Sequence, residues 1–145
     1  MTATREFAIT RTGRFDLEQI SRQFADTFET LEVREDLFST DVFFDLNMPV
    51  WRFQLQGREP FAEQLRRITR GDVRIEVLRT LQTDSGFVTE HVETQQIGQD
   101  EVSARKIWLC ELVADKIVHA TCYCTGEWNA ALRARHALEA PMLRP

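Results

Sequence analysis

The sequence predicts an α+β fold in which helices cover one face of an antiparallel β-sheet. Apolar residues recur at helical spacing early in the chain, alternate at strand spacing later, and are separated there by short turn sequences. Helices followed by hairpin-connected strands are typical of this class. A sheet that curves strongly around such helices leaves a cavity at its open end.

Four segments have the pattern of helices. Residues 17–31 follow a capping-box-like start and carry apolar side chains every three to four positions. A shorter helical piece is expected at 34–40, and a longer helix at 60–70, ending before a glycine. The Ala- and Leu-rich segment 129–140 indicates a last helix.

Strands are expected where apolar and polar residues alternate. Residues 42–44 are extended, and residues 51–56 alternate clearly after a break at a proline. Turn sequences then separate four further strands, at 72–83, 86–96, 101–113 and 116–128.

Size and composition limit the function classes. The 145 residues suit one domain, spanning 1–145 with an ordered body at about 15–138. With 43% apolar and 28% charged residues, the chain has the composition of a globular protein. A net charge of -5 without a basic run argues against nucleic acid as a partner. No apolar stretch of about 18 residues and no signal-peptide pattern occurs, so we expect a cytoplasmic protein outside membranes.

The three cysteines are expected to be free thiols, because their number is odd and no export signal precedes them. Cys122 and Cys124 share one strand face, where small side chains leave room for a cavity. We expect them, with Cys110, to be buried small hydrophobic residues rather than zinc ligands, and therefore expect no metal.

The face on which His91 lies depends on the turn after its strand. A two-residue turn at Gly98 and Gln99 pairs His91 near Lys106 and places it on the face of Trp108, whereas a three-residue loop reverses the face. His91 is then either an acid/base group of a pocket or a hydrogen-bonded residue at a subunit interface.

Two glutamates of the same strand are alternatives for a pocket carboxylate. Glu90 and Glu93 lie on opposite faces, so one of them is a candidate. The other interpretation is an exposed cross-strand partner for Arg105 or Lys106.

The segments 88–94 and 105–113 carry apolar residues on both strand faces. A monomer with one solvated sheet face does not need this arrangement. We therefore expect a homodimer formed through the sheet face.

The element order, with VFFDLNMPVWRFQLQG leading into a helix and then the hairpins, resembles the nuclear-transport-factor-2-like (NTF2-like) superfamily and its SnoaL-like, polyketide-cyclase-like small proteins. The matching features are an Asp ending the first strand, a Gly opening a helix and a closing Gly-Glu-Trp at 126–128. The resemblance covers almost the whole chain. It implies a cone-shaped, cystatin-like α+β barrel, usually dimeric, with an apolar pocket between helices and concave sheet, and it implies no single reaction.

The steroid-isomerase branch of that superfamily carries a proton-shuttling carboxylate at the position of Asp45, so the resemblance implies Asp45 as a general base. His91 is its candidate partner, and the indole N–H of Trp108 is a candidate hydrogen-bond donor. The branch's tyrosine in the first helix is absent, and its second acid falls on Ile107 or Trp108. The alternative is that Asp45 only caps the turn before Pro49.

Aromatic and small side chains are either ligand contacts or core filling. We expect a pocket for a small apolar or polycyclic ligand with a carbonyl or hydroxyl group. The protein would act as a cofactor-independent isomerase, dehydratase or cyclase by acid/base chemistry. The alternative is a non-catalytic ligand-binding or structural dimerisation module. The candidate ligand contacts are Phe24, Trp51, Phe53, Cys122 and Cys124.

Overall fold

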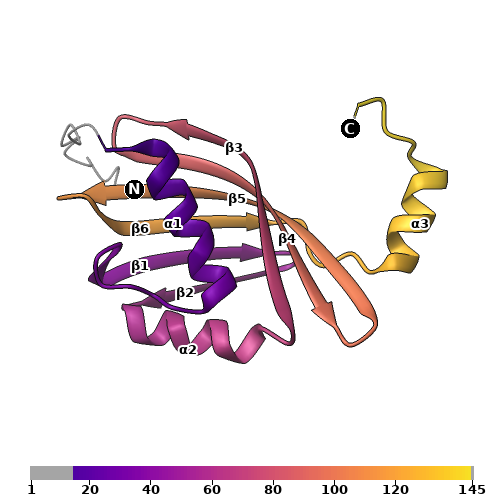
Figure 1. Ribbon diagram of the computed structural model, residues 1–145, viewed down its shortest axis with the longest axis horizontal. Helices are drawn as coiled ribbons and strands as arrows, with labels where there is room; N and C mark the ends of the chain where they lie inside the picture. Colours follow the sequence, from indigo (N-terminus) through magenta and orange to yellow (C-terminus); the bar gives the residue numbers. More distant parts are fainter. Residues whose placement is uncertain (1–14, 145) are drawn as a thin grey trace, which may run out of the picture.

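The computed structural model describes residues 15–144; residues 1–14 and 145 of the expected domain lie outside the described part. The described residues form α1 (Leu17–Thr30), β1 (Phe38–Met48), β2 (Trp51–Gln56), α2 (Arg58–Ile68), β3 (Asp72–Gln82), β4 (Gly86–Ile97), β5 (Asp100–Val113), β6 (Lys116–Cys124) and α3 (Ala130–Glu139). The strands build one curved, open sheet, α1 crosses one face of it, α2 lies beside β1 and β2, and α3 projects away (Figure 1). The predicted α+β class is confirmed.

The sheet has the strand order β2-β1-β6-β5-β4-β3. Every neighbouring pair is antiparallel except β1 and β6, which are parallel. The first and last strands of the chain therefore meet in the interior of the sheet, and β2 and β3 form its two edges.

The first helix begins where the sequence predicts. The side chain of Asp16 accepts a hydrogen bond from the backbone N–H of Gln19 at 3.0 Å, which satisfies one of the free donors of the first turn. Ile20, Phe24 and Phe28 recur at three-to-four spacing and are buried. This face of α1 covers the concave side of the sheet.

The prediction of a short helix at 34–40 is wrong. The backbone N–H groups of Leu37 and Phe38 bond the carbonyl of Arg34 at 3.2 and 3.0 Å, which makes a single turn. Beyond it, Ile117 donates its N–H to the carbonyl of Leu37 at 2.8 Å. Pairing with β6 thus draws the chain into β1 at Phe38, because a strand contact outweighs a short helical preference.

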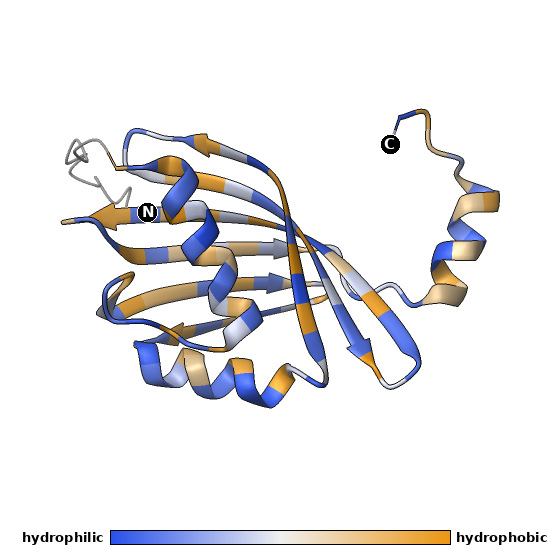
Figure 2. Cartoon of the chain, viewed as in Figure 1, coloured by the Kyte–Doolittle hydropathy of each residue, from blue (hydrophilic) through white to orange (hydrophobic). Residues whose placement is uncertain are grey.

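An aromatic core fills the space between α1 and the sheet. Phe24 is fully buried, and its ring centroid lies 5.2 Å from that of Phe28, 5.9 Å from that of Phe87 and 5.3 Å from that of Trp108. Hydrophobic and hydrophilic residues alternate along β3 in Figure 2, as expected when only one face of a strand is covered. Among residues 15–144, none of the helices is long and apolar enough to cross a membrane.

The length of the turn between β4 and β5 determines the pairing register of these two strands and so the face on which His91 lies. Ile97 pairs with Asp100, so the loop has two residues, and Gly98 adopts a positive φ of 63° that suits glycine. His91 therefore lies opposite Lys106. It shares the concave face with Lys106 and, two residues along β5, with Trp108.

Candidate functional site

An apolar cavity of about 160 Å³ lies between α2 and the concave face of the sheet. Helices and strands far apart in the sequence contribute to its wall, and most of the contributed side chains are aliphatic or aromatic. The lining residues are Phe28, Leu46, Met48, Phe53, Phe61, Gln64, Leu65, Ile68, Thr69, Val73, Glu93, Lys106 and Trp108.

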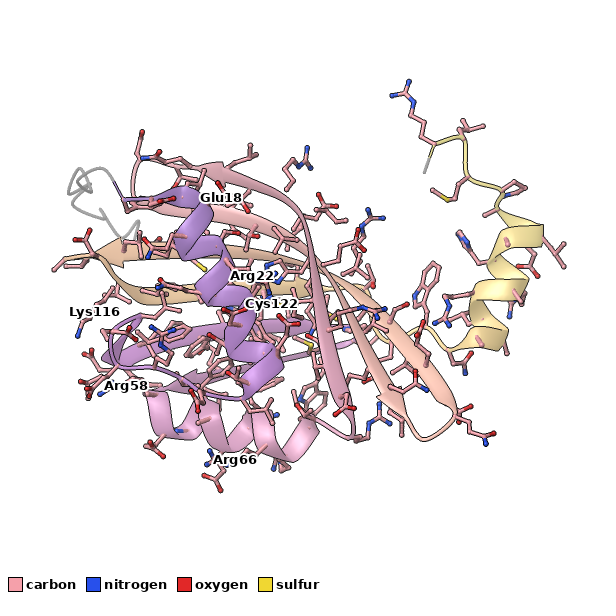
Figure 3. The ribbon with its side chains drawn as sticks, viewed as in Figure 1. Glu18, Arg22, Arg58, Arg66, Lys116 and Cys122 are labelled. Carbon is pink, nitrogen blue, oxygen red and sulfur yellow. The ribbon has the colours of Figure 1, made fainter. Side chains whose placement is uncertain are left out.

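Helix α2 forms one wall because its apolar side chains fall on one face. It starts after Gly57, whose φ of 105° favours glycine. Phe61 and Leu65 are one helical turn apart and buried, and the ring of Phe61 stacks on Phe44 of β1 with centroids 3.7 Å apart. On the other side of the helix, Arg66 points away from the sheet (Figure 3). The amphipathic pattern of α2 thus closes the cavity.

A carboxylate and an ammonium group lie in this mostly apolar wall, which also contains the neutral polar side chains of Gln64 and Thr69. The Nζ of Lys106 donates to Oε2 of Glu93 at 2.7 Å, and each side chain is only 13% exposed. Burial acts to lower the pKa of Lys106, but the charge of Glu93 and its hydrogen bond act in the opposite sense, and the pKa ends above its ordinary value. Lys106 is therefore a charged donor at neutral pH.

His91 of β4 pairs with Lys106 of β5 and does not line the cavity. Its ring is buried near Phe24 and Phe28, and its Nε2 has no hydrogen-bond partner among the described residues. Burial, with a further contribution from the charge of Lys106, lowers the pKa of His91 to about 4. The imidazole is therefore neutral at neutral pH.

Trp108, predicted as a hydrogen-bond donor, is one of the residues that line the cavity. Its ring centroid lies 5.1 Å from that of Phe28. The indole nitrogen is buried and lacks a partner among the described residues, so the ring presents its apolar surface and keeps its N–H in the core.

The structure corrects the expected placement of Asp45. Its neighbour Leu46 lines the cavity, so strand alternation turns Asp45 to the outer face of the sheet. Arg52 of β2 donates to both carboxylate oxygens at 2.9 and 2.7 Å. These hydrogen bonds and the charge of Arg52 hold the pKa of Asp45 below its ordinary value, against a smaller effect of burial. Its partner is thus Arg52, across the hairpin, and not the turn before Pro49.

The residues predicted as ligand contacts do not all lie at the cavity. Phe53 lines the cavity, whereas Phe24 and Cys122 are fully buried in the core and the half-buried Cys124 does not line the cavity. Trp51, the first residue of β2, is 71% exposed. Burial raises the pKa of Cys122 to about 12, so this thiol stays protonated. The three cysteines are free, and the described residues contain no group of three or more potential metal ligands.

The sequence left two interpretations of Glu93 open, a pocket carboxylate or a cross-strand partner of a basic residue. Glu93 is both the pocket carboxylate and the cross-strand partner of Lys106. The α2 side chains that line the cavity were not among the predicted site residues, although the apolar spacing of Phe61, Leu65 and Ile68 was a usable signal.

No family model matches the sequence, and no curated protein matches it. Several solved structures, however, match the fold of this chain. An NTF2-like protein from Anabaena variabilis aligns with a TM-score of 0.63 at 16% identity, covering 81% of this chain and 96% of its own. A protein of ketosteroid isomerase-like fold from Catenulispora acidiphila, in complex with trimethylamine, has a TM-score of 0.59 at 14% identity, covering 74% and 86%. An LEH-like epoxide hydrolase from M. tuberculosis has a TM-score of 0.59 at 17% identity, covering 72% and 75%.

At these identities the likeness concerns the fold alone. The chain has the NTF2-like fold that the sequence resemblance implied.

Proposed function

We propose that the cavity binds a small neutral molecule with an apolar body and one carbonyl or hydroxyl oxygen, and that Glu93 and Lys106 act on it as an acid/base pair. The observation that carries this proposal is the desolvated ion pair in a mostly apolar wall. Titratable groups in such a wall are typical of sites that bind or transform small molecules.

The size of the cavity favours a ligand of about one ring. Its volume of about 160 Å³ is close to that of an apolar cavity of about 150 Å³ that holds benzene. Pockets for larger, drug-sized ligands occupy roughly 300–1,000 Å³. This argues for the small apolar ligand among the sequence expectations and against the polycyclic one.

The charge of the wall favours a neutral ligand. Glu93 and Lys106 carry opposite charges and contact each other. A ligand with a net charge would enter an apolar site in which no unpaired counter-charge lines the described wall. A neutral oxygen can instead accept a hydrogen bond from the ammonium group without this cost.

The chemistry that fits is proton transfer next to a carbonyl. The carboxylate of Glu93 takes a proton from the carbon beside the carbonyl, the C–H electron pair moves into the C–C bond, and oxygen gains negative charge. Lys106 stabilises that charge by a hydrogen bond. Return of the proton to the same or a conjugated carbon completes exchange or isomerisation, and atoms and charge balance without a further reactant.

A second candidate is binding without catalysis. It is favoured by the 2.7 Å contact itself, because Glu93 and Lys106 satisfy each other and each must weaken that bond to act on a ligand. In this case the pair only anchors the polar end of the ligand.

Proton exchange from cyclohexanone in D₂O, followed by ¹H NMR, tests the acid/base role. We expect the protein to accelerate loss of the α-proton signal and Glu93→Gln to reduce that rate by about 100-fold or more. Glu90→Gln is the matched control, since Glu90 lies on the same strand and pairs with Arg79 and Arg105. Equal rates for the protein and Glu93→Gln would contradict catalysis by this carboxylate, and no acceleration at all would favour the binding role.

We also propose a homodimer through the outer sheet face. Ile107, Leu109 and Tyr123 are 40%, 41% and 56% exposed and belong to the adjacent strands β5 and β6, which supports an apolar contact surface. Light scattering at micromolar concentration should give twice the 16.9 kDa of one chain. A species of 16.9 kDa would contradict the dimer.

A further inference from the structure

We propose that Gln95 is a positioning residue for Glu93: it holds the carboxylate in the cavity wall and ties it to the rim segment, residues 69–71, between α2 and β3. This inference deepens the proposed function and rests on it. Gln95 is only 5% exposed, which is unusual for an uncharged amide unless both its polar atoms are used.

Gln95 is one link in a chain of hydrogen bonds. The backbone N–H of Arg70 donates to its Oε1 at 3.2 Å, and its Nε2 donates to Oε1 of Glu93 at 3.4 Å. Lys106 donates to the other oxygen of Glu93 at 2.7 Å. Each carboxylate oxygen thus has its own donor, and the two donors come from different strands.

The chemistry of the two ends explains why an amide stands here. A backbone N–H only donates and a carboxylate only accepts, so one orientation of the amide satisfies both. Glutamate in its place would still accept from Arg70 but would face Glu93 with a second carboxylate. Methionine would fill the space and make neither bond.

The rim segment is itself fixed to β4. A Cβ at Gly71 would lie 1.8 Å from the carbonyl oxygen of Gln96, so only glycine allows this approach of the two backbones. Thr69 lines the cavity two residues away. The rim, Gln95 and Glu93 therefore form one frame around the polar end of the cavity.

The titratable groups around Glu93 come from three strands. Lys106 of β5 supplies the positive charge, His91 of β4 is neutral, and Cys122 of β6 stays a protonated thiol. From α2, the cavity receives the neutral side chain of Gln64. A second carboxylate at position 95 would thus share one ammonium group with Glu93, and proton uptake by the two acids would begin at higher pH.

The test is a pH titration of the Glu93 carboxyl carbon by ¹³C NMR, assigned by comparison with Glu93→Gln. We expect Gln95→Glu to move the titration midpoint up by about one pH unit or more. Gln96→Glu is the matched control: it adds the same charge one residue away, on an exposed side chain of the opposite face, and should leave the midpoint in place.

A second variant separates positioning from folding. Gln95→Met removes both hydrogen bonds without adding charge, and we expect kcat for cyclohexanone exchange to fall about tenfold with KM little changed. An unchanged Glu93 midpoint in Gln95→Glu would overturn the positioning role, whatever the exchange assay gives. A shifted midpoint without any exchange by the unaltered protein would leave the positioning role and overturn the acid/base function.

Discussion

Replacing Lys106 by methionine is expected to lower the free energy of unfolding by about 3 kcal/mol. The side chains of Lys106 and Glu93 are each 13% exposed and lie 2.7 Å apart, so the substitution leaves a carboxylate in an apolar wall without its partner. The loss of stability comes more from the uncompensated charge of the Glu93 carboxylate than from the lost attraction between Glu93 and Lys106. Urea denaturation followed by tryptophan fluorescence measures the change.

The double variant Glu93→Gln, Lys106→Met is the control for this prediction. It removes both charges at once and leaves a neutral amide that still fits beside Gln95. We expect it to recover most of the lost stability, because exchanging a buried ion pair for neutral side chains of similar volume is often close to neutral. If the double variant is as unstable as Lys106→Met, the loss is due to packing and the ion pair is not its cause.

Acid is expected to destabilise the protein through His91. Burial and the charge of Lys106 lower the pKa of this imidazole from its ordinary value of 6.5 to about 4 in the folded state. The unfolded chain therefore binds more protons between these pH values, so stability is retained above pH 6.5 and is lost as the pH falls to 4. The full loss is about 3 kcal/mol.

Substitution of His91 by leucine should remove this part of the acid sensitivity. Nε2 of His91 has no partner among the described residues, so leucine abandons no hydrogen bond at that atom and fits among Phe24 and Phe28. Unfolding free energies at pH 7 and pH 4.5 measure the difference. His119→Leu, on the outer face beside Phe43, should retain the loss. An unchanged pH dependence in His91→Leu would contradict the buried, neutral imidazole.

Local patterns in the sequence predicted much of the fold because they are set by neighbours in the chain. The strands β3 to β6 begin within about one residue of their predicted starts, since alternation and turn residues specify them directly. The capping of α1 by Asp16 is equally local. The face of His91 needed one further fact, the length of the turn at Gly98 and Gln99.

Contacts between distant segments could not be predicted in this way. The parallel pairing of β1 with β6 and the loss of the helical piece at 34–40 both depend on residues near Ile117. Nothing within the segment 34–40 reports that partner, because register between distant strands is a property of the whole sheet.

The site shows the same division between local and distant information. Val42, Phe44 and Leu46 form the buried face of β1, so strand alternation alone predicts that Asp45 faces outward. The resemblance to a catalytic position instead implied that Asp45 faces the pocket. The pairing of Glu93 with Lys106 was one of two alternatives until the register between β4 and β5 was known. The position of this pair in a cavity wall also depends on the packing of α2 against the sheet, which the sequence near Glu93 does not specify.

The most direct test of the proposed ligand site uses the methionine methyl groups as reporters. Met48 lines the cavity, whereas Met142 is 69% exposed near the end of the chain. With ¹³C-methyl-labelled methionine, addition of cyclohexanone should shift the Met48 signal until it saturates and leave Met142 in place. A Met48 signal that does not move, or one that moves together with Met142 without saturation, would contradict a ligand site in this cavity.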